Sequence, residues 1–209
     1  MIQNFNTENI VAVILGAGLS ERMNGYPKPL IKFKGKYLTE YIYGNLINLL
    51  FEHIIFVAGH KSETVVKHLN FLKKIKFVTN ENYRHGQFSS LKCGLKYIKN
   101  NNIKFEYILI LLCDTPFIKL DTYLKLLNSL EENKIIIPSY NYQAGHPVII
   151  NKSIFDIMLN ASDNSISKEI INSKKESIKY IEVDDENILK DFDNKKDLDG
   201  QNWKFEELG

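Results

Sequence analysis

Cysteine is scarce in this sequence of 209 residues, which contains only Cys93 and Cys113. Two cysteines cannot build a disulfide framework, nor can they alone supply a four-ligand zinc site. We therefore expect a cytoplasmic protein, because thiols stay reduced in that compartment.

Long apolar runs are also missing. The run from Tyr107 to Cys113 is among the longest, well short of the roughly 18 residues that cross a bilayer. The first ten residues contain no lysine or arginine, so the apolar run after them lacks the basic start of a signal peptide. We expect no membrane association.

An excess of charge of either sign is absent too. Lysine and arginine number 27 against 25 for aspartate and glutamate, a net charge of +2, and the basic residues are scattered along the chain. This balance gives no general field for DNA or RNA, so we expect no nucleic-acid partner. The length suits one α/β domain over residues 1–209, without repeats or low-complexity linkers.

Short apolar runs alternate with amphipathic stretches. Ile10–Leu15, His53–Ala58 and Lys76–Thr79 have the pattern of buried strands, whereas Tyr37–Phe51 and Glu63–Leu72 have helical spacing. This alternation predicts an α/β fold of three layers, a mostly parallel twisted sheet with helices on both faces. Further strands are expected at Tyr107–Cys113, Ile135–Pro138 and Ile178–Val183, and further helices from Leu120, at Ile154–Leu159 and at Ile166–Ile171.

A small-residue loop, Gly16-Ala17-Gly18, ends the first strand. Small residues let backbone N–H groups approach an anion, and glycine tolerates the turns that point successive N–H groups inward. Arg22 and Lys28 follow at a spacing that lets a guanidinium and an ammonium bind different oxygens of one polyphosphate. We interpret this loop as a cradle for a nucleoside triphosphate.

Three other interpretations of this loop are weighed. A dinucleotide-binding loop, G-x-G-x-x-G, is disfavoured because Glu21 stands at the third glycine position, where a carboxylate would face a pyrophosphate. A P-loop is excluded here because no Gly-Lys-Ser or Gly-Lys-Thr follows. An ordinary strand-to-helix turn with solvated charges is the plainest alternative, made less probable by Arg22 and Lys28 together.

Asp114 stands at the carboxyl end of the apolar run that begins at Tyr107, and Pro116 follows it. A carboxylate at the edge of a sheet is costly unless it meets a cation, and Mg²⁺ is usually held by one or two carboxylates plus phosphates. The alternative is a cap on the turn before the helix at Leu120. Ser89 or Ser90 likewise opens a helix, either as an ordinary N-cap or as an anion contact.

Several motifs in order give the chain a resemblance to a known family. The stretch L-G-A-G-L-S-E-R-M-N with P-K-P-L resembles the small nucleotidyltransferases, in particular the molybdenum cofactor cytidylyltransferase and guanylyltransferase group. The segments N-E-N-Y-R-H-G-Q-F-S-S-L, C-D-T-P, G-H-P-V and D-F-D-N-K-K-D-L are similar to later motifs of that group. Two departures occur: Gly16 replaces an alanine, and residues 24–26 lengthen the loop before Lys28.

The resemblance implies a Rossmann-like nucleotidyltransferase fold of the GT-A-like type, with Mg²⁺, or Mn²⁺, as cofactor. It implies Asp114 and Asp193 as metal ligands, and His146 as an acceptor contact; without it, a structural role would be preferred for His146. Arg22, Lys28 and Asp114 would act in catalysis. The implied nucleotide-binding residues are Leu15, Gly16, Ala17, Gly18, Ser20, Arg22, Lys28, Gly86, Ser89 and Ser90.

The expected function is transfer of a nucleoside monophosphate from an NTP, with CTP favoured, to a small phosphate-bearing acceptor. The resemblance favours molybdopterin as that acceptor and a molybdoenzyme as recipient of the product. A sugar phosphate or phosphocholine could replace molybdopterin on the same cradle. Another alternative is a non-catalytic carrier that holds a nucleotide-bearing cofactor for a partner enzyme, and a nicotinamide dehydrogenase is disfavoured by Glu21.

Overall fold

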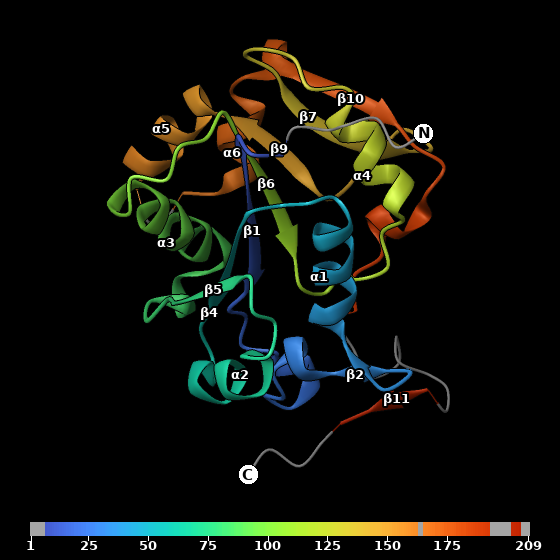
Figure 1. Ribbon diagram of the computed structural model, residues 1–209. Coiled ribbons are helices and arrows are strands. Elements are labelled where there is room, and N and C mark those ends of the chain that lie inside the picture. The colour runs from blue at the N-terminus through green and yellow to red at the C-terminus, as the bar shows by residue number, and fades with distance from the viewer. Residues whose placement is uncertain (1–6, 163–164, 193–201, 206–209) are drawn as a thin grey trace.

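An eight-stranded sheet forms the centre of the computed structural model, which describes residues 7–162, 165–192 and 202–205. The strand order is β10-β7-β9-β6-β1-β4-β5, with β8 paired to β7 (Figure 1). The strands are β1 (Ile10–Gly16), β4 (His53–Ala58), β5 (Ile75–Thr79), β6 (Tyr107–Leu112), β7 (Ile135–Tyr140), β8 (Gln143–Ala144), β9 (Val148–Asn151) and β10 (Ile178–Glu182).

The sheet is mostly parallel, as the alternation of elements predicts. β1 runs parallel to both β4 and β6, and parallel pairs also join β4 to β5 and β7 to β10. The exceptions are β9, antiparallel to β6 and β7, and the short β8. Because β1 lies between its neighbours in the centre, all seven of its residues are buried.

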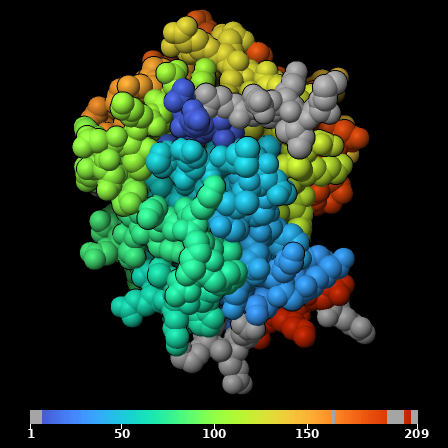
Figure 2. Space-filling view, viewed as in Figure 1, coloured from blue at the N-terminus to red at the C-terminus, as the bar shows by residue number. Residues whose placement is uncertain are grey.

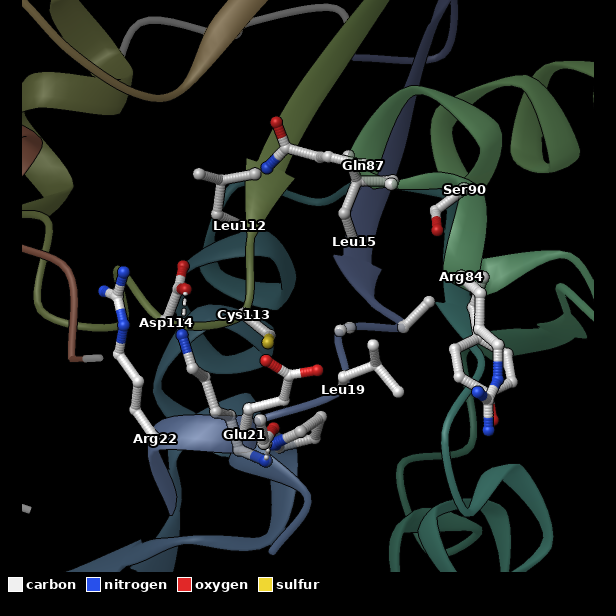
Figure 3. Close-up of a pocket in the computed structure, with 18 residues that line it drawn as sticks. Leu15, Leu19, Glu21, Arg22, Arg84, Gln87, Ser90, Leu112, Cys113 and Asp114 are labelled. Carbon is white, nitrogen blue, oxygen red and sulfur yellow. Dashed lines mark hydrogen bonds and ion pairs between the residues drawn. The ribbon is translucent and has the colours of Figure 1, made fainter. Parts of the chain in front are cut away.

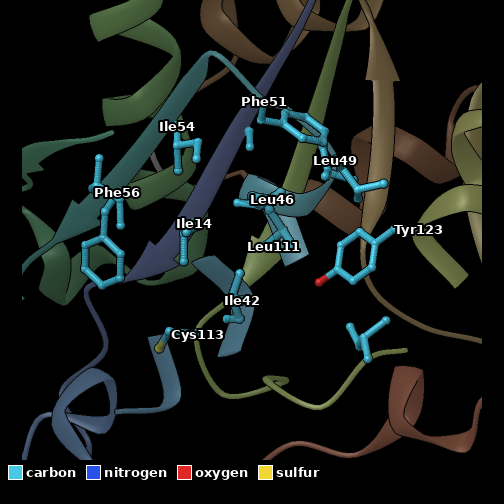
Figure 4. Close-up of a cluster of buried hydrophobic side chains, with 14 of the residues drawn as sticks. Ile14, Ile42, Leu46, Leu49, Phe51, Ile54, Phe56, Leu111, Cys113 and Tyr123 are labelled. Carbon is cyan, nitrogen blue, oxygen red and sulfur yellow. The ribbon is translucent and has the colours of Figure 1, made fainter. Parts of the chain in front are cut away.

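Helices cover both faces of the sheet and bury two apolar cores. One core joins the sheet to α1, α2 and α4, and includes Ile14, Phe56 and Tyr123 (Figure 4). The other joins the opposite face to α3, α5 and α6. The predicted three-layer α/β fold is thereby confirmed. The helices are α1 (Leu38–Asn48), α2 (Ser62–Leu69), α3 (Gln87–Asn100), α4 (Leu120–Leu127), α5 (Lys152–Asn160) and α6 (Ser167–Asn172).

Several expected boundaries are wrong. The helices expected to reach Phe51 and Leu72 end at Asn48 and Leu69. β7 does not end at Pro138 but continues to Tyr140, because the Pro138 carbonyl still accepts a hydrogen bond from the Gly145 backbone at 3.0 Å and only a donor is lost. The helix α3 begins at Gln87, so neither Ser89 nor Ser90 opens it; Gly86 is the residue before the first turn.

A small second sheet lies beside the loop that follows β1. It has the order β11-β2-β3, formed by β2 (Lys32–Phe33), β3 (Lys36–Tyr37) and β11 (Trp203–Lys204). In the space-filling view of Figure 2, red residues of the C-terminal end lie against blue residues of the N-terminal part. No helix of the described residues has the length and apolarity to cross a membrane. The division of 1–209 into a single domain stays a prediction.

Candidate active site

A cavity of about 410 Å³ opens at the carboxyl ends of β1 and β6 (Figure 3). Ligands of open α/β sheets bind at this edge, where the loops after parallel strands diverge. The structure brings most of the sequence-predicted nucleotide residues to this cavity, although their roles stay predictions. Those that line it are Leu15, Gly16, Ala17, Gly18, Ser20, Arg22, Lys28, Gly86 and Ser90. The predicted metal ligand Asp114 lines it as well.

Ser20 shapes the loop that carries the two cations. Its backbone is left-handed (φ 53°), and its carbonyl accepts hydrogen bonds from the backbone N–H groups of Met23 and Gly25 at 2.8 and 3.0 Å. Its hydroxyl oxygen accepts a further bond from the Lys28 backbone N–H at 3.4 Å. These bonds fold the loop over itself, which places Arg22 and Lys28 on the same rim of the cavity.

Lys28 and Asp114 form an ion pair inside the cavity, although 86 residues separate them in the chain. The Lys28 Nζ lies 2.8 Å from Asp114 Oδ2, and the two side chains are only 15% and 19% exposed. The other carboxylate oxygen, Oδ1, is buried and has no hydrogen-bond partner in the structure. A buried carboxylate oxygen without a partner is costly, so this atom fits a hard divalent cation.

Asp114 would hold such a cation with few other protein ligands. Among the described residues no group of three His, Cys, Asp or Glu side chains could hold a metal ion. Phosphate oxygens and water would supply the remaining ligands, as is usual for Mg²⁺ bound with a nucleotide. The predicted second ligand, Asp193, lies outside the described residues; the preceding Phe192 donates its backbone N–H to the Asp114 carbonyl at 3.0 Å.

Asn80 fixes the two serines at the start of α3. Its buried side-chain amide donates to Ser89 Oγ at 3.0 Å and to Ser90 Oγ at 3.1 Å, while its oxygen accepts from the Asn82 backbone N–H at 3.0 Å. The Ser89 hydroxyl also lies 2.8 Å from the Gly86 carbonyl. Ser89 is thus engaged within the protein, whereas Ser90 lines the cavity.

His146 does not line this cavity, and its acceptor role stays a prediction. Its backbone N–H donates to the Ile188 carbonyl at 3.0 Å, and its Nδ1 is buried without a hydrogen-bond partner. Burial lowers the pKa of the imidazole below its usual 6.5, opposed by the negative charge of Asp114 and by a hydrogen bond to the Ile110 backbone. His146 is therefore a neutral group at pH 7.

Sequence reasoning missed several lining residues, namely Glu21, Arg84, Gln87 and Cys113. Arg84 and Gln87 flank Gly86 in the segment already singled out, so the motif could have indicated them. Glu21 was considered only as a misfit to a dinucleotide loop, yet it lines the cavity in the 3-10 turn Glu21–Met23. The cavity thus combines three cationic side chains with two carboxylates.

The fold and the site together are those of an α/β protein of the nucleotidyltransferase type. Its mostly parallel sheet carries, at the carboxyl edge, a glycine loop and a lysine paired with the carboxylate that follows β6. Residues 12–178 match the sequence model of a protein family described as the MobA-like NTP transferase domain. The chain belongs to this family. The predicted resemblance is confirmed, and the protein is a nucleotidyltransferase.

Individual relatives carry different names. A probable molybdenum cofactor guanylyltransferase of Clostridium perfringens is 32% identical over 173 residues, covering 82% of this chain and 80% of the relative. The molybdenum cofactor cytidylyltransferase of Escherichia coli is 26% identical over 143 residues, covering 68% and 70%. Nicotine blue oxidoreductase of Paenarthrobacter nicotinovorans is 23% identical over 192 residues, covering 88% and 92%.

Solved structures share the fold. The crystal structure of Rv0371c from Mycobacterium tuberculosis superposes with a TM-score of 0.75 at 20% identity, covering 91% of this chain and 95% of that one. The 4-diphosphocytidyl-2C-methyl-D-erythritol synthase of Anaerococcus prevotii gives a TM-score of 0.72 at 18% identity, covering 95% and 96%. These likenesses confirm the predicted fold class.

Proposed function

We propose that this nucleotidyltransferase transfers the nucleoside monophosphate of CTP to the phosphate of molybdopterin, or of the molybdenum cofactor, and releases pyrophosphate. The observation that carries the proposal is the ion pair between Lys28 and Asp114, which lies in the same cavity as the glycine loop. The buried Oδ1 of Asp114 has no hydrogen-bond partner there. The acceptor is inferred from relatives named as molybdenum cofactor guanylyl- and cytidylyltransferases. Delivery of the product to a molybdoenzyme belongs to the same proposal.

The reaction needs no side-chain nucleophile. An oxygen of the acceptor phosphate attacks the α-phosphorus of the nucleotide, the bond from that phosphorus to the bridging oxygen breaks, and pyrophosphate leaves with the electron pair. Mg²⁺, or Mn²⁺, bound by Asp114 would neutralise charge on the phosphate oxygens. Arg22 and the backbone N–H groups of residues 16–18 would stabilise the pyrophosphate, where negative charge increases.

Lys28 has a second task in this scheme. Its ammonium group holds Asp114 at 2.8 Å and carries three donors, so it can bind a phosphate oxygen while it still contacts the carboxylate. It thereby places the nucleotide phosphates beside the carboxylate that would hold the metal. Such positioning by fixed charges is the main contribution that a protein makes to phosphoryl-group chemistry.

The preference for CTP is the finer part of the proposal. The relatives include proteins named for guanylyl and for cytidylyl transfer. Two features of the sequence resemble the cytidylyltransferase pattern more closely than the guanylyltransferase pattern. They are the loop A-G-L-S-E-R-M and the serine pair Ser89-Ser90. Ser90 and Gln87 line the end of the cavity near Leu15, remote from Asp114 in Figure 3, where we place the base and ribose.

The test is pyrophosphate release from each of the four NTPs with Mg²⁺, with and without molybdopterin, using the wild-type protein. Release from CTP that requires molybdopterin is expected. Asp114→Ala and Arg22→Ala should lower turnover by about 100-fold or more while the domain stays folded. Asp114→Asn, which keeps the shape but not the charge, serves as the matched variant.

Each contrary outcome would overturn a different part of the proposed function. Near-wild-type turnover in Asp114→Ala or Arg22→Ala would reject the assigned site. Faster release from GTP would reject the CTP preference, and faster release with a sugar phosphate or phosphocholine would reject the acceptor. Nucleotide binding without any pyrophosphate release would identify a carrier instead of an enzyme.

A further inference from the structure

The C-terminal strand β11 brings the sole tryptophan of the chain against β2 and against the buried cluster that contains Met23 and Ile31. Trp203 is opposite Phe33 of β2 in antiparallel register, and the Lys34 backbone N–H donates to the Asn202 carbonyl at 2.8 Å. No local pattern predicts this pairing, because its two strands are only two residues long each and lie at opposite ends of the sequence.

Trp203 belongs to a cluster of aromatic rings, which we call the aromatic clasp: Phe33, Phe117, Phe192 and Trp203. The ring of Trp203 lies 4.5 Å from that of Phe33, 5.1 Å from that of Phe192 and 6.1 Å from that of Phe117, centroid to centroid. Phe117 and Phe192 contact each other edge to face at 5.3 Å. These separations are those of favourable aromatic pairs.

The aromatic clasp lies next to the three segments that carry Arg22, Lys28 and Asp114. Phe117 comes three residues after Asp114, and the backbone N–H of Phe192 donates to the Asp114 carbonyl. The clasp also packs on the buried side chains of Met23 and Ile31. Met23 follows Arg22 directly in the sequence. Ile31 follows the turn Lys28–Leu30, and the backbone N–H of Ile31 donates to the Lys28 carbonyl.

We propose that Trp203 is a positioning residue of the active site, which acts through the aromatic clasp to hold the Asp114, Arg22 and Lys28 segments in their mutual arrangement. This inference rests on the proposed function. β11 lies outside residues 12–178, which the family model matches, so this support comes from a part of the chain beyond that match. Residues behind a metal ligand typically change metal affinity or activity by 10- to 100-fold when they are removed.

The test compares Trp203→Ala with Trp203→Phe, which keeps a ring in the clasp. Phe105→Ala is the control, because Phe105 is also half-buried and packs on one ring, that of Phe155 at 4.8 Å, but lies at the opposite end of β6. Mn²⁺ binding in the presence of CTP is measured from the electron paramagnetic resonance signal of free Mn²⁺. Denaturation midpoints report folding, and kcat and KM for CTP are measured separately.

Trp203→Ala is expected to weaken Mn²⁺ binding about tenfold and to lower kcat more than it raises KM, with a folded domain. Trp203→Phe should restore most of both, and Phe105→Ala should leave Mn²⁺ affinity at the wild-type value despite a lower denaturation midpoint. Wild-type Mn²⁺ affinity and kcat in Trp203→Ala, or an equal loss in Phe105→Ala, would overturn the inference. Equal Mn²⁺ binding by wild type and Asp114→Ala would instead overturn the proposed metal site.

Discussion

Lys28 and Asp114 act as one unit at the scale of single residues. Their ion pair is mostly shielded from solvent, so the attraction between the charges is offset by the hydration that both lose, and the net contribution to folding is small. What the pair does provide is orientation, because Lys28 holds Oδ2 of Asp114 and leaves the buried Oδ1 without a hydrogen-bond partner. Function, more than stability, explains why this carboxylate lies there.

Gly16 shows how one neighbour explains a departure from the family motif. A Cβ at position 16 would overlap the ring of Phe56, a fully buried residue of the first core. The nucleotidyltransferase motif that this loop resembles usually has an alanine at this position. In this chain an alanine does not fit between β1 and β4 unless Phe56 moves.

We expect Gly16→Ala to lower the free energy of unfolding by about 1–3 kcal/mol, because it overpacks a filled core. Urea denaturation measures the change. Gly18→Ala is the control, since a Cβ there would meet no heavy atom within 4 Å, and it should change stability by less than about 0.5 kcal/mol. Equal stability of the two variants would contradict the argument.

Helix α3 shows what happens at the scale of an element. Its start was predicted from two serines, whereas the structure begins it at Gln87 and buries both serine hydroxyls against Asn80. The sequence pattern located the helix correctly but not the residue before its first turn, because glycine and serine are both common at that position. The contact of both serines with Asn80, which follows β5, is visible only in the structure.

We expect Asn80→Ala to destabilise the domain by roughly 1–3 kcal/mol, since the buried hydroxyls and the Asn82 backbone N–H lose a partner. The affinity for CTP should fall about tenfold because Ser90 is no longer fixed, a change of about 1.4 kcal/mol. Denaturation and titration calorimetry measure the two effects.

Asn101→Ala at the exposed end of α3 is the control for this prediction. Asn101 also makes a side-chain hydrogen bond, to the Tyr97 carbonyl at 2.9 Å, but it lies away from the cavity. Its removal should change stability by less than about 0.5 kcal/mol and leave CTP affinity as in the wild type. Unchanged CTP binding in Asn80→Ala would show that Asn80 supports the fold alone.

At the scale of the whole molecule, burial couples His146 to the pH dependence of stability. Its pKa is lowered in the folded protein, chiefly by desolvation, and stays near 6.5 in the unfolded chain. Below pH 6.5 the unfolded chain thus binds more protons at this site than the folded protein does. The linkage relation then requires stability to rise with pH in this range.

We expect the contribution of His146 to be fully favourable above about pH 6.5 and to decrease as the pH falls from 6.5 toward the lowered pKa. Denaturation of the wild type and of His146→Gln from pH 5 to 8 measures it. The difference between the two free energies of unfolding should shift in favour of His146→Gln as the pH falls. A difference that stays constant, or shifts the other way, would contradict a lowered pKa.

The sequence by itself determined most strands of the central sheet, although not the buried β9, and it determined that a glycine loop follows β1 and that Asp114 stands after β6. These features depend on local periodicity and on residues adjacent in the chain. Tertiary structure alone decided that Lys28 pairs with Asp114, that Phe56 excludes a side chain at Gly16, and that Trp203 packs on Phe33. Each of these contacts joins segments far apart in sequence, and such contacts depend on strand order and packing, which no local pattern specifies.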